Sequence, residues 1–137
     1  MVRRIATIAV AGILLGAGWA LGQQAPVTQP TLMHAFAFTP VATATPQDFE
    51  NLKKATADMV GKIPGLRRAW VGKLRTPVDL GPVAPKREYG IALEFDDVKA
   101  LDAYAEHPAH AAWERVYRRV REPGTTTFDI QIGRAHV

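Results

Sequence analysis

Residues Leu101 to Val120, LDAYAEHPAHAAWERVYRRV, constrain the fold most, because two amphipathic helical segments meet there at a proline. In each segment apolar residues recur at spacings of three and four, which places them on one helical face. Pro108 disfavours helix at the preceding residue but suits the first position of a new helix. The pattern predicts a short helix, a bend at Glu106 and His107, and a second helix that starts near Pro108. This bend would position His107 and His110, one helical turn after Tyr104.

Four other segments are predicted to be strands. Residues 32–39 alternate so that His34, Phe36 and Phe38 share one largely apolar face, and residues 88–95 alternate in the same way. In residues 66–75, Leu66, Trp70 and Leu74 would point one way and smaller apolar residues the other. Residues 125–131 form a last strand, for which we expect an inward-facing Phe128 and Ile130. Apolar groups on both faces of a strand predict that both faces of the sheet are covered.

A longer helix is predicted between the first two strands. Thr45 offers an N-cap, Pro46 the first helical position, and Pro64-Gly65 a stop. Residues 76–85 contain three prolines and a glycine, which predicts a loop. The order β-α-β-β-α-β, with the second helix broken at Pro108, indicates an α+β, ferredoxin-like fold with an antiparallel four-stranded sheet. Helices would cover one face only, so the other face is predicted to be paired.

Several of these segments resemble the Dabb family, the stress-responsive dimeric α/β-barrel domain. The HPAH run at His107 to His110 follows Tyr104 by three residues, after a strand and an acidic turn at Tyr89 to Asp97. A first strand with a histidine among large apolar residues fits Met33 to Phe38. An Ile-Pro-Gly turn after the first helix fits Lys62 to Gly65. HPAH alone is a short match, but this order of elements is more specific.

The resemblance covers roughly residues 32–131 and implies a homodimer in which two sheets enclose a barrel. Plant polyketide cyclases of the family use a Tyr/His pair for an intramolecular aldol condensation. Their catalytic residues match Tyr104 and His110, and a further pocket histidine matches His34. On that basis His110 would remove a proton next to a carbonyl group, Tyr104 would orient the carbonyl, and Phe36 and Phe38 would line an apolar pocket.

Two interpretations of function therefore stand. One is a Dabb domain that binds a small apolar or aromatic molecule without catalysis, and the other is a cyclase-like enzyme. HPAH could also be a feature of the fold alone, with His107 as either a ligand-binding residue or the cap of the second helix. His107 and His110 could share a helical face, but no obvious set of ligands completes a metal site. A related haem-degrading or quinol-oxidising monooxygenase is a further enzyme class, yet no haem ligand stands out, and we predict no cofactor.

The N-terminal residues 1–22 have the pattern of a secretory signal peptide. Arg3 and Arg4 precede a Gly/Ala-rich apolar run, and Ala20 and Gly22 provide small residues for cleavage. An uncleaved membrane anchor is the alternative. Cleavage predicts export to the periplasm or the extracellular space, without stable membrane association. Because the chain contains no cysteine, it has neither a lipoprotein attachment site nor disulfides.

The remaining boundaries follow from composition. Residues 23–31 are polar and contain proline, which predicts an exposed lead-in to a domain over residues 32–131. Residues 132–137, IGRAHV, match the translation of a common sequencing adapter, and we interpret them as read-through.

Removing Arg3, Arg4 and Arg134 from the 17 basic residues leaves 14, against 13 acidic residues. The domain is thus nearly neutral, which argues against nucleic acid as a partner.

Overall fold

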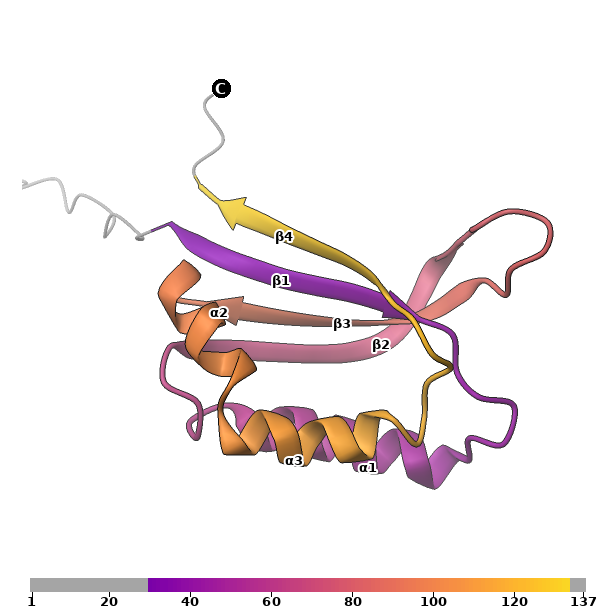
Figure 1. The fold of residues 1–137 in the computed structure, drawn as a ribbon, viewed down its shortest axis with the longest axis horizontal. Helices are drawn as coiled ribbons and strands as arrows, with labels where there is room; N and C mark the ends of the chain where they lie inside the picture. The colour runs from indigo at the N-terminus through magenta and orange to yellow at the C-terminus, as the bar shows by residue number, and fades with distance from the viewer. Residues whose placement is uncertain (1–29, 134–137) are drawn as a thin grey trace, which may run out of the picture.

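The computed structural model describes residues 30–133, which form one antiparallel sheet covered by helices on one face (Figure 1). The elements are β1 (Thr31–Phe38), α1 (Pro46–Met59), β2 (Leu66–Val78), β3 (Arg87–Phe95), α2 (Val98–Ala105), α3 (Pro108–Tyr117) and β4 (Thr126–Ile132). The strand order is β2-β3-β1-β4. The predicted ferredoxin-like arrangement is therefore confirmed, and the broken second helix consists of α2 and α3.

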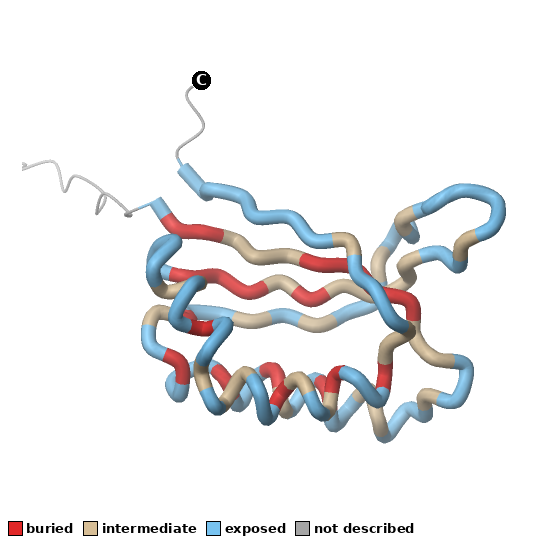
Figure 2. The backbone as a smooth tube through the Cα atoms, in the orientation of Figure 1, coloured by how far each residue is buried: buried red, intermediate tan, exposed pale blue. Residues whose placement is uncertain are grey.

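The core lies between the sheet and its helices. Buried residues lie along β1 and β3 and recur along α1 and α3, whereas β4 and most of β2 are exposed or only partly buried (Figure 2). The two central strands supply the alternating apolar residues that the sequence predicts. The fully buried large side chains include Phe38, Leu52, Met59, Ile63, Leu93, Phe95 and Val120. Burial of this continuous apolar surface is the main stabilising term of the fold.

Local signals set the ends of the helices. Thr45 and Asp48 form a reciprocal capping box at the start of α1. The helix ends at Met59, earlier than the predicted stop at Pro64-Gly65, because Gly61 takes a left-handed conformation with φ of 86°. Ile63 still reaches the core from the turn that follows. In α2 the carboxylate of Asp97 accepts a 2.9 Å bond from the backbone N–H of Ala100 and caps the helix.

The open face of the sheet carries more apolar residues than the sequence patterns indicate. Phe128 and Ile130 pair with Ala35 and Met33 of β1 and point away from the helices, with 50% and 53% exposure. The expectation that they face inward toward the helices is wrong, because the register of β4 directs Thr127, Asp129 and Gln131 to that side. On β2, a bulge between Leu66 and Arg68 places Leu66 in the core but leaves Trp70, at 45% exposure, on the open face.

The first and last strands form the two ends of the described sheet. β1 begins one residue earlier than expected, at Thr31, whose buried hydroxyl donates a 2.9 Å bond to Glu94. Ile132 pairs with Thr31 and ends β4. The predicted signal peptide, most of the lead-in and residues 134–137 lie outside the described residues. Across residues 30–133, no helix combines the length and the apolar character needed to cross a membrane.

A buried hydrogen-bonded triad joins α1 to α3. The Thr56 hydroxyl donates to the carbonyl of Leu52 at 2.8 Å and accepts from the indole Nε1 of Trp113, also at 2.8 Å.

Replacing Thr56 by Val leaves the buried indole N–H unpaired, so we expect a loss of about 1–3 kcal/mol in the free energy of unfolding. Urea denaturation at one fixed protein concentration measures it. The exposed control Thr76→Val should change stability by less than about 0.5 kcal/mol, and equal effects would contradict this role for Thr56.

Candidate ligand site

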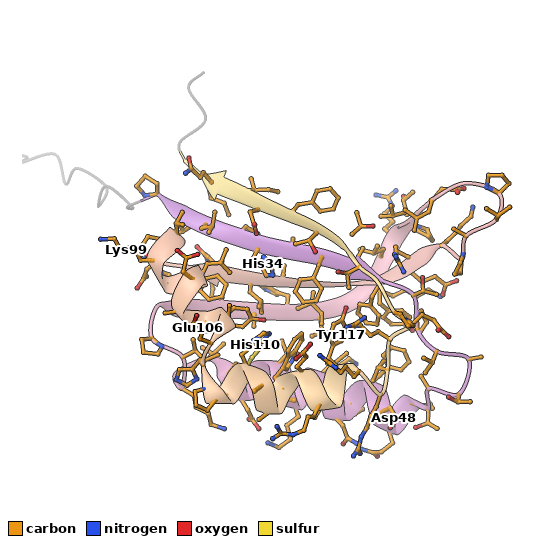
Figure 3. The ribbon with its side chains drawn as sticks, viewed as in Figure 1. His34, Asp48, Lys99, Glu106, His110 and Tyr117 are labelled. Atoms are coloured by element: carbon orange, nitrogen blue, oxygen red, sulfur yellow. The ribbon has the colours of Figure 1, made fainter. Side chains whose placement is uncertain are left out.

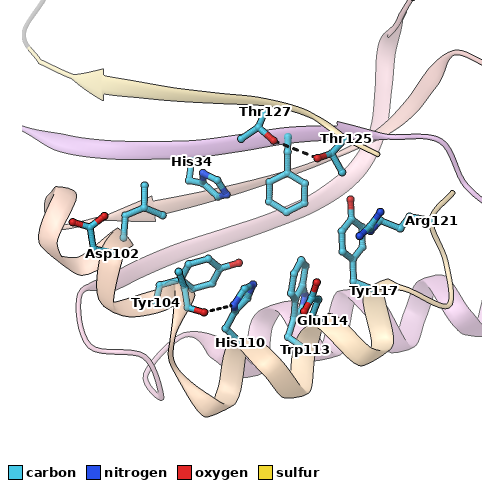
Figure 4. Close-up of a pocket in the computed structure, with 13 residues that line it drawn as sticks. His34, Asp102, Tyr104, His110, Trp113, Glu114, Tyr117, Arg121, Thr125 and Thr127 are labelled. Atoms are coloured by element: carbon cyan, nitrogen blue, oxygen red, sulfur yellow. Dashed lines mark hydrogen bonds between the residues drawn. The ribbon is translucent and has the colours of Figure 1, made fainter. Parts of the chain in front are cut away.

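A cavity of about 400 Å³ lies between the sheet and the bent pair α2–α3 (Figure 4). Its wall is formed by side chains from β1, α2, α3, the segment after α3 and the start of β4. The lining residues are His34, Phe36, Leu101, Asp102, Tyr104, Ala105, His110, Trp113, Glu114, Tyr117, Arg121, Thr125 and Thr127. The volume lies within the range of small-molecule sites in proteins. Figure 3 shows His34 on the sheet facing His110 and Tyr117 on α3.

Aromatic rings form the apolar part of this wall. Trp113 and Tyr117, one helical turn apart on α3, stack with ring centroids 4.8 Å apart. Phe36 on β1 meets them edge-on, with centroids 6.1 Å from Trp113 and 5.6 Å from Tyr117. All three rings are buried. Such a surface favours a flat apolar or aromatic ligand.

His34 is held by an acid that the sequence analysis did not identify. β1 and β4 place His34 directly opposite Asp129, and its Nδ1 lies 2.6 Å from the Asp129 Oδ1. A carboxylate can only accept here, so Nδ1 carries the proton, and Nε2 is an acceptor whenever the ring is neutral. If Phe128 and Ile130 face the helices, alternation along the strand places Asp129 on the open face and away from His34. The opposite alternation of β4 would have identified it.

Tyr104 and His110 are brought together by the bend between α2 and α3. Their ring centroids are 4.1 Å apart. The His110 Nδ1 lies 3.2 Å from the carbonyl oxygen of Ala105, to which it donates, so Nε2 is again the acceptor of the neutral ring. Burial raises the pKa of Tyr104 well above its ordinary value, with a smaller contribution from the nearby Glu114 carboxylate. The Tyr104 hydroxyl is therefore a hydrogen-bond donor at neutral pH, not a phenolate base.

Two residues of the predicted site lie elsewhere. His107 is the N-cap of α3, where its Nδ1 accepts a 3.1 Å bond from the backbone N–H of Ala109. Phe38 is fully buried between Tyr89 and Tyr117. Neither lines the cavity. The structure thus brings His34, Phe36, Tyr104 and His110 into one site and leaves Phe38 and His107 in the scaffold.

Other lining residues had not been predicted as functional. Trp113 and Tyr117 were recognised only as the apolar stripe of the second helix, and that stripe faces the cavity as well as the core. Arg121 follows α3 and is brought over the Tyr117 ring, with its guanidinium carbon 4.9 Å from the ring centroid. No local sequence pattern marks that contact. In the part of the chain that the structure describes, no group of three His, Asp or Glu side chains is arranged to hold a metal ion.

The Asp129 contact predicts the tautomer of His34. At a pH where the imidazoles are neutral, we expect His34 to carry its proton on Nδ1, whereas Asp129→Ala should shift it toward the Nε2–H form. Long-range ¹H–¹⁵N correlation spectra of the imidazole rings distinguish the two. His107 is the internal control, because its Nδ1 accepts a backbone bond and should keep the Nε2–H form in both proteins. An unchanged His34 tautomer in the variant would contradict the assigned role of Asp129.

The fold is shared with several solved structures. A dimeric ferredoxin-like protein of unknown function from Thermobifida fusca is 21% identical, with 75% of this chain and 92% of that chain covered and a TM-score of 0.58. A Dabb family protein from Mesorhizobium loti is 18% identical, with 74% and 96% covered and a TM-score of 0.53. The hydroxynitrile lyase from Passiflora edulis is 11% identical, with 80% and 99% covered and a TM-score of 0.61. At such identities the likeness concerns the fold.

The sequence itself matches a family. Comparison with curated proteins gives no match. The Stress responsive A/B Barrel Domain model, by contrast, matches residues 32–132, which include every strand and helix described above except for Thr31, the first residue of β1. The chain therefore belongs to the Dabb family of stress-responsive A/B barrel domains.

Proposed function

We propose that this protein is an exported, homodimeric Dabb domain that binds a small aromatic molecule in the cavity between the sheet and α2–α3. The observation that carries this proposal is the combination of a wall of stacked rings with three polar groups from separate elements. Trp113 and Tyr117 offer flat apolar surface, the Tyr104 hydroxyl can donate a hydrogen bond, and the His34 and His110 Nε2 atoms can accept one. A phenol or an aromatic ketone has matching chemistry.

The energetics favour such a ligand. A bicyclic aromatic ring that packs against Phe36, Trp113 and Tyr117 is removed from water. This burial contributes about 25 cal/mol to the binding free energy for each Å² of apolar surface. Offset or edge-on ring contacts add roughly 0.5–1.5 kcal/mol per pair. One hydrogen bond from the Tyr104 hydroxyl adds about 0.5–1.5 kcal/mol. The aromatic wall therefore provides most of the affinity, and the polar groups orient the ligand.

Calorimetric titration with 2-naphthol tests the site. We expect binding by the native protein, and an affinity roughly two- to tenfold lower in Tyr104→Phe and His110→Gln, corresponding to one lost hydrogen bond. Tyr89→Phe is the matched control, because Tyr89 stacks on Phe49 outside the cavity. Its affinity should equal that of the native protein. Undetectable binding, or equal losses in Tyr104→Phe and Tyr89→Phe, would overturn the proposed site.

An enzymatic role of polyketide-cyclase type is the second candidate. It is favoured by the contact between Tyr104 and His110, because an acceptor nitrogen beside a protonated tyrosine suits general acid–base chemistry. His110 Nε2 would take a proton from a carbon next to a carbonyl, and Tyr104 would donate to the oxygen where negative charge develops. The enolate carbon would then form the new C–C bond at a second carbonyl, whose oxygen takes up the proton.

Turnover separates binding from catalysis. With a linear poly-β-keto thioester as substrate, the enzymatic role requires cyclisation by the native protein. Replacing His110 by Gln should abolish this cyclisation while 2-naphthol affinity falls only modestly. Cyclisation at the background rate in the native protein, or unchanged turnover in the variant, would leave the binding role alone.

The open sheet face supports a homodimer. Solved relatives of this fold from Thermobifida fusca and Jannaschia are described as dimeric. In this chain, apolar side chains gather on the face opposite the helices, where Trp70, Phe128, Ile130 and Ile132 are 40–53% exposed. A groove of about 320 Å³ also lies there, lined by Trp70, Leu74 and Phe128 among others. Pairing with a second copy would remove this surface from water.

Dimerisation is tested by a charge on this face. Phe128→Lys places a cation where the two sheets would meet, so we expect the dimer to dissociate to monomer. Sedimentation velocity at micromolar concentration measures the change. Val83→Lys is the control, because Val83 is almost fully exposed in the β2–β3 loop. A native monomer, or an unchanged dimer in Phe128→Lys, would contradict pairing through the open face.

Export rests on the pattern of residues 1–22 alone. Cleavage in this region would release the Dabb domain with a short polar N-terminal extension.

A further inference from the structure

We propose that the cavity contains an anion-binding end, formed by Arg121, Tyr117, Thr125 and Thr127, and that its ligand is an aromatic carboxylic acid. This inference rests on the proposed binding function and adds the charge and orientation of the ligand. Figure 4 shows the Arg121 guanidinium and the Tyr117 hydroxyl together at one end of the cavity, near the two threonines, with Asp102 at the opposite end. The cavity is therefore polarised along its length.

The Tyr117 hydroxyl is the first sign of a ligand at this end. Tyr117 is only 4% exposed, and its ring is enclosed by Phe36, Phe38 and Trp113. Its hydroxyl has no hydrogen-bond partner among the described residues. Leaving a buried hydroxyl unpaired costs stability, and such groups are normally paired. A ligand oxygen at this end of the cavity would accept this bond.

Arg121 is the second sign. Its guanidinium lies over the Tyr117 ring, its Nε is buried without a partner, and Nη1 donates only to the Glu122 carbonyl at 3.3 Å. It makes no ion pair with the acids of residues 30–133. Its backbone is fixed by a β-bridge to Pro40. The structure thus holds a cation at the cavity that has no direct ion-pair partner among residues 30–133.

Neighbouring groups complete this end of the cavity. The Thr125 and Thr127 hydroxyls lie 3.3 Å apart, and either can donate. Glu114 is an acid that also lines the cavity, and its carboxylate accepts a 2.7 Å bond from Arg118. That hydrogen bond is the main reason why its pKa is lowered, and the charge of Arg121 contributes less. Asp129 is likewise engaged by His34.

The geometry favours a carboxylate on a flat ring. A guanidinium pairs with the two oxygens of a carboxylate in a planar arrangement, and such charge-assisted bonds are about twice as strong as neutral ones. The stacked Trp113 and Tyr117 rings lie between this end and Tyr104. An aromatic acid could therefore place its carboxylate at Arg121 and its ring on Trp113, with its distal part toward Tyr104 and His110.

A matched pair of probes tests the inference. 2-Naphthoate and 2-naphthamide have nearly the same size but differ in charge. By calorimetric titration at low ionic strength, we expect the native protein to bind 2-naphthoate about tenfold more tightly than the amide. Arg121→Gln should remove that preference, because the loss of affinity should be larger for 2-naphthoate than for 2-naphthamide. Tyr117→Phe should reduce the preference for 2-naphthoate over 2-naphthamide. Arg119→Gln removes the same charge from an exposed neighbouring position and should preserve the preference.

The outcomes separate this inference from the proposed function. Equal affinities for the two probes in the native protein, or a preference that survives in Arg121→Gln, would overturn the anion-binding end and leave aromatic binding intact. An equal loss of preference in Arg119→Gln would also overturn it, because the effect would then be general electrostatics. Failure of both probes to bind would overturn the proposed function and this inference with it. Far-UV and near-UV circular dichroism spectra that match those of the native protein verify that Arg121→Gln is folded.

Discussion

The candidate site depends on the break between α2 and α3. Tyr104 and His110 are six positions apart in the chain, and in one continuous helix they would lie about 9 Å apart along the axis and on different faces. Pro108 starts a new helix, His107 caps it, and the change of direction brings the two rings to 4.1 Å. The same bend opens the space beside β1 that the cavity occupies. His107 thus shapes the backbone of the site and does not line the cavity.

A second constraint is the register of β4 on β1. Side chains alternate along a strand, so a shift of one residue would exchange the two faces. The observed register directs Thr127 and Asp129 toward the helices and Phe128 and Ile130 toward the open face. One edge strand therefore provides polar groups to the cavity and apolar surface for pairing with a second copy. Asp129 fixes His34 only because the two residues are directly opposite each other.

Regular patterns in the sequence were sufficient to predict the fold. Alternation in β1 and β3, the Thr45 cap and the proline at residue 108 each have one direct structural consequence, and each was predicted. The short last strand carries threonines before its apolar residues, so alternation alone did not determine which set faced the helices. In β2, the bulge after Leu66 interrupts the alternation, so Leu66 and Trp70 lie on opposite faces of the sheet.

The site was only partly predictable. His34, Tyr104 and His110 stand out as polar or titratable residues within apolar patterns, and the resemblance to a family pointed to them. Arg121 and Asp129 do not stand out, because both belong to segments rich in polar residues. Their roles depend on tertiary contacts, with Tyr117 in one case and His34 in the other. Such contacts cannot be predicted from the periodicity of a helix or strand, because they join residues of different segments.

The central claim is that ligands bind on the helix side of the sheet and not on its open face. Intermolecular nuclear Overhauser effects between 2-naphthol and the labelled protein test this claim most directly. We expect contacts from the naphthalene protons to Phe36, Tyr104 and Trp113, because these residues line the cavity. Contacts confined to Trp70 and Phe128, on the opposite face, would contradict it.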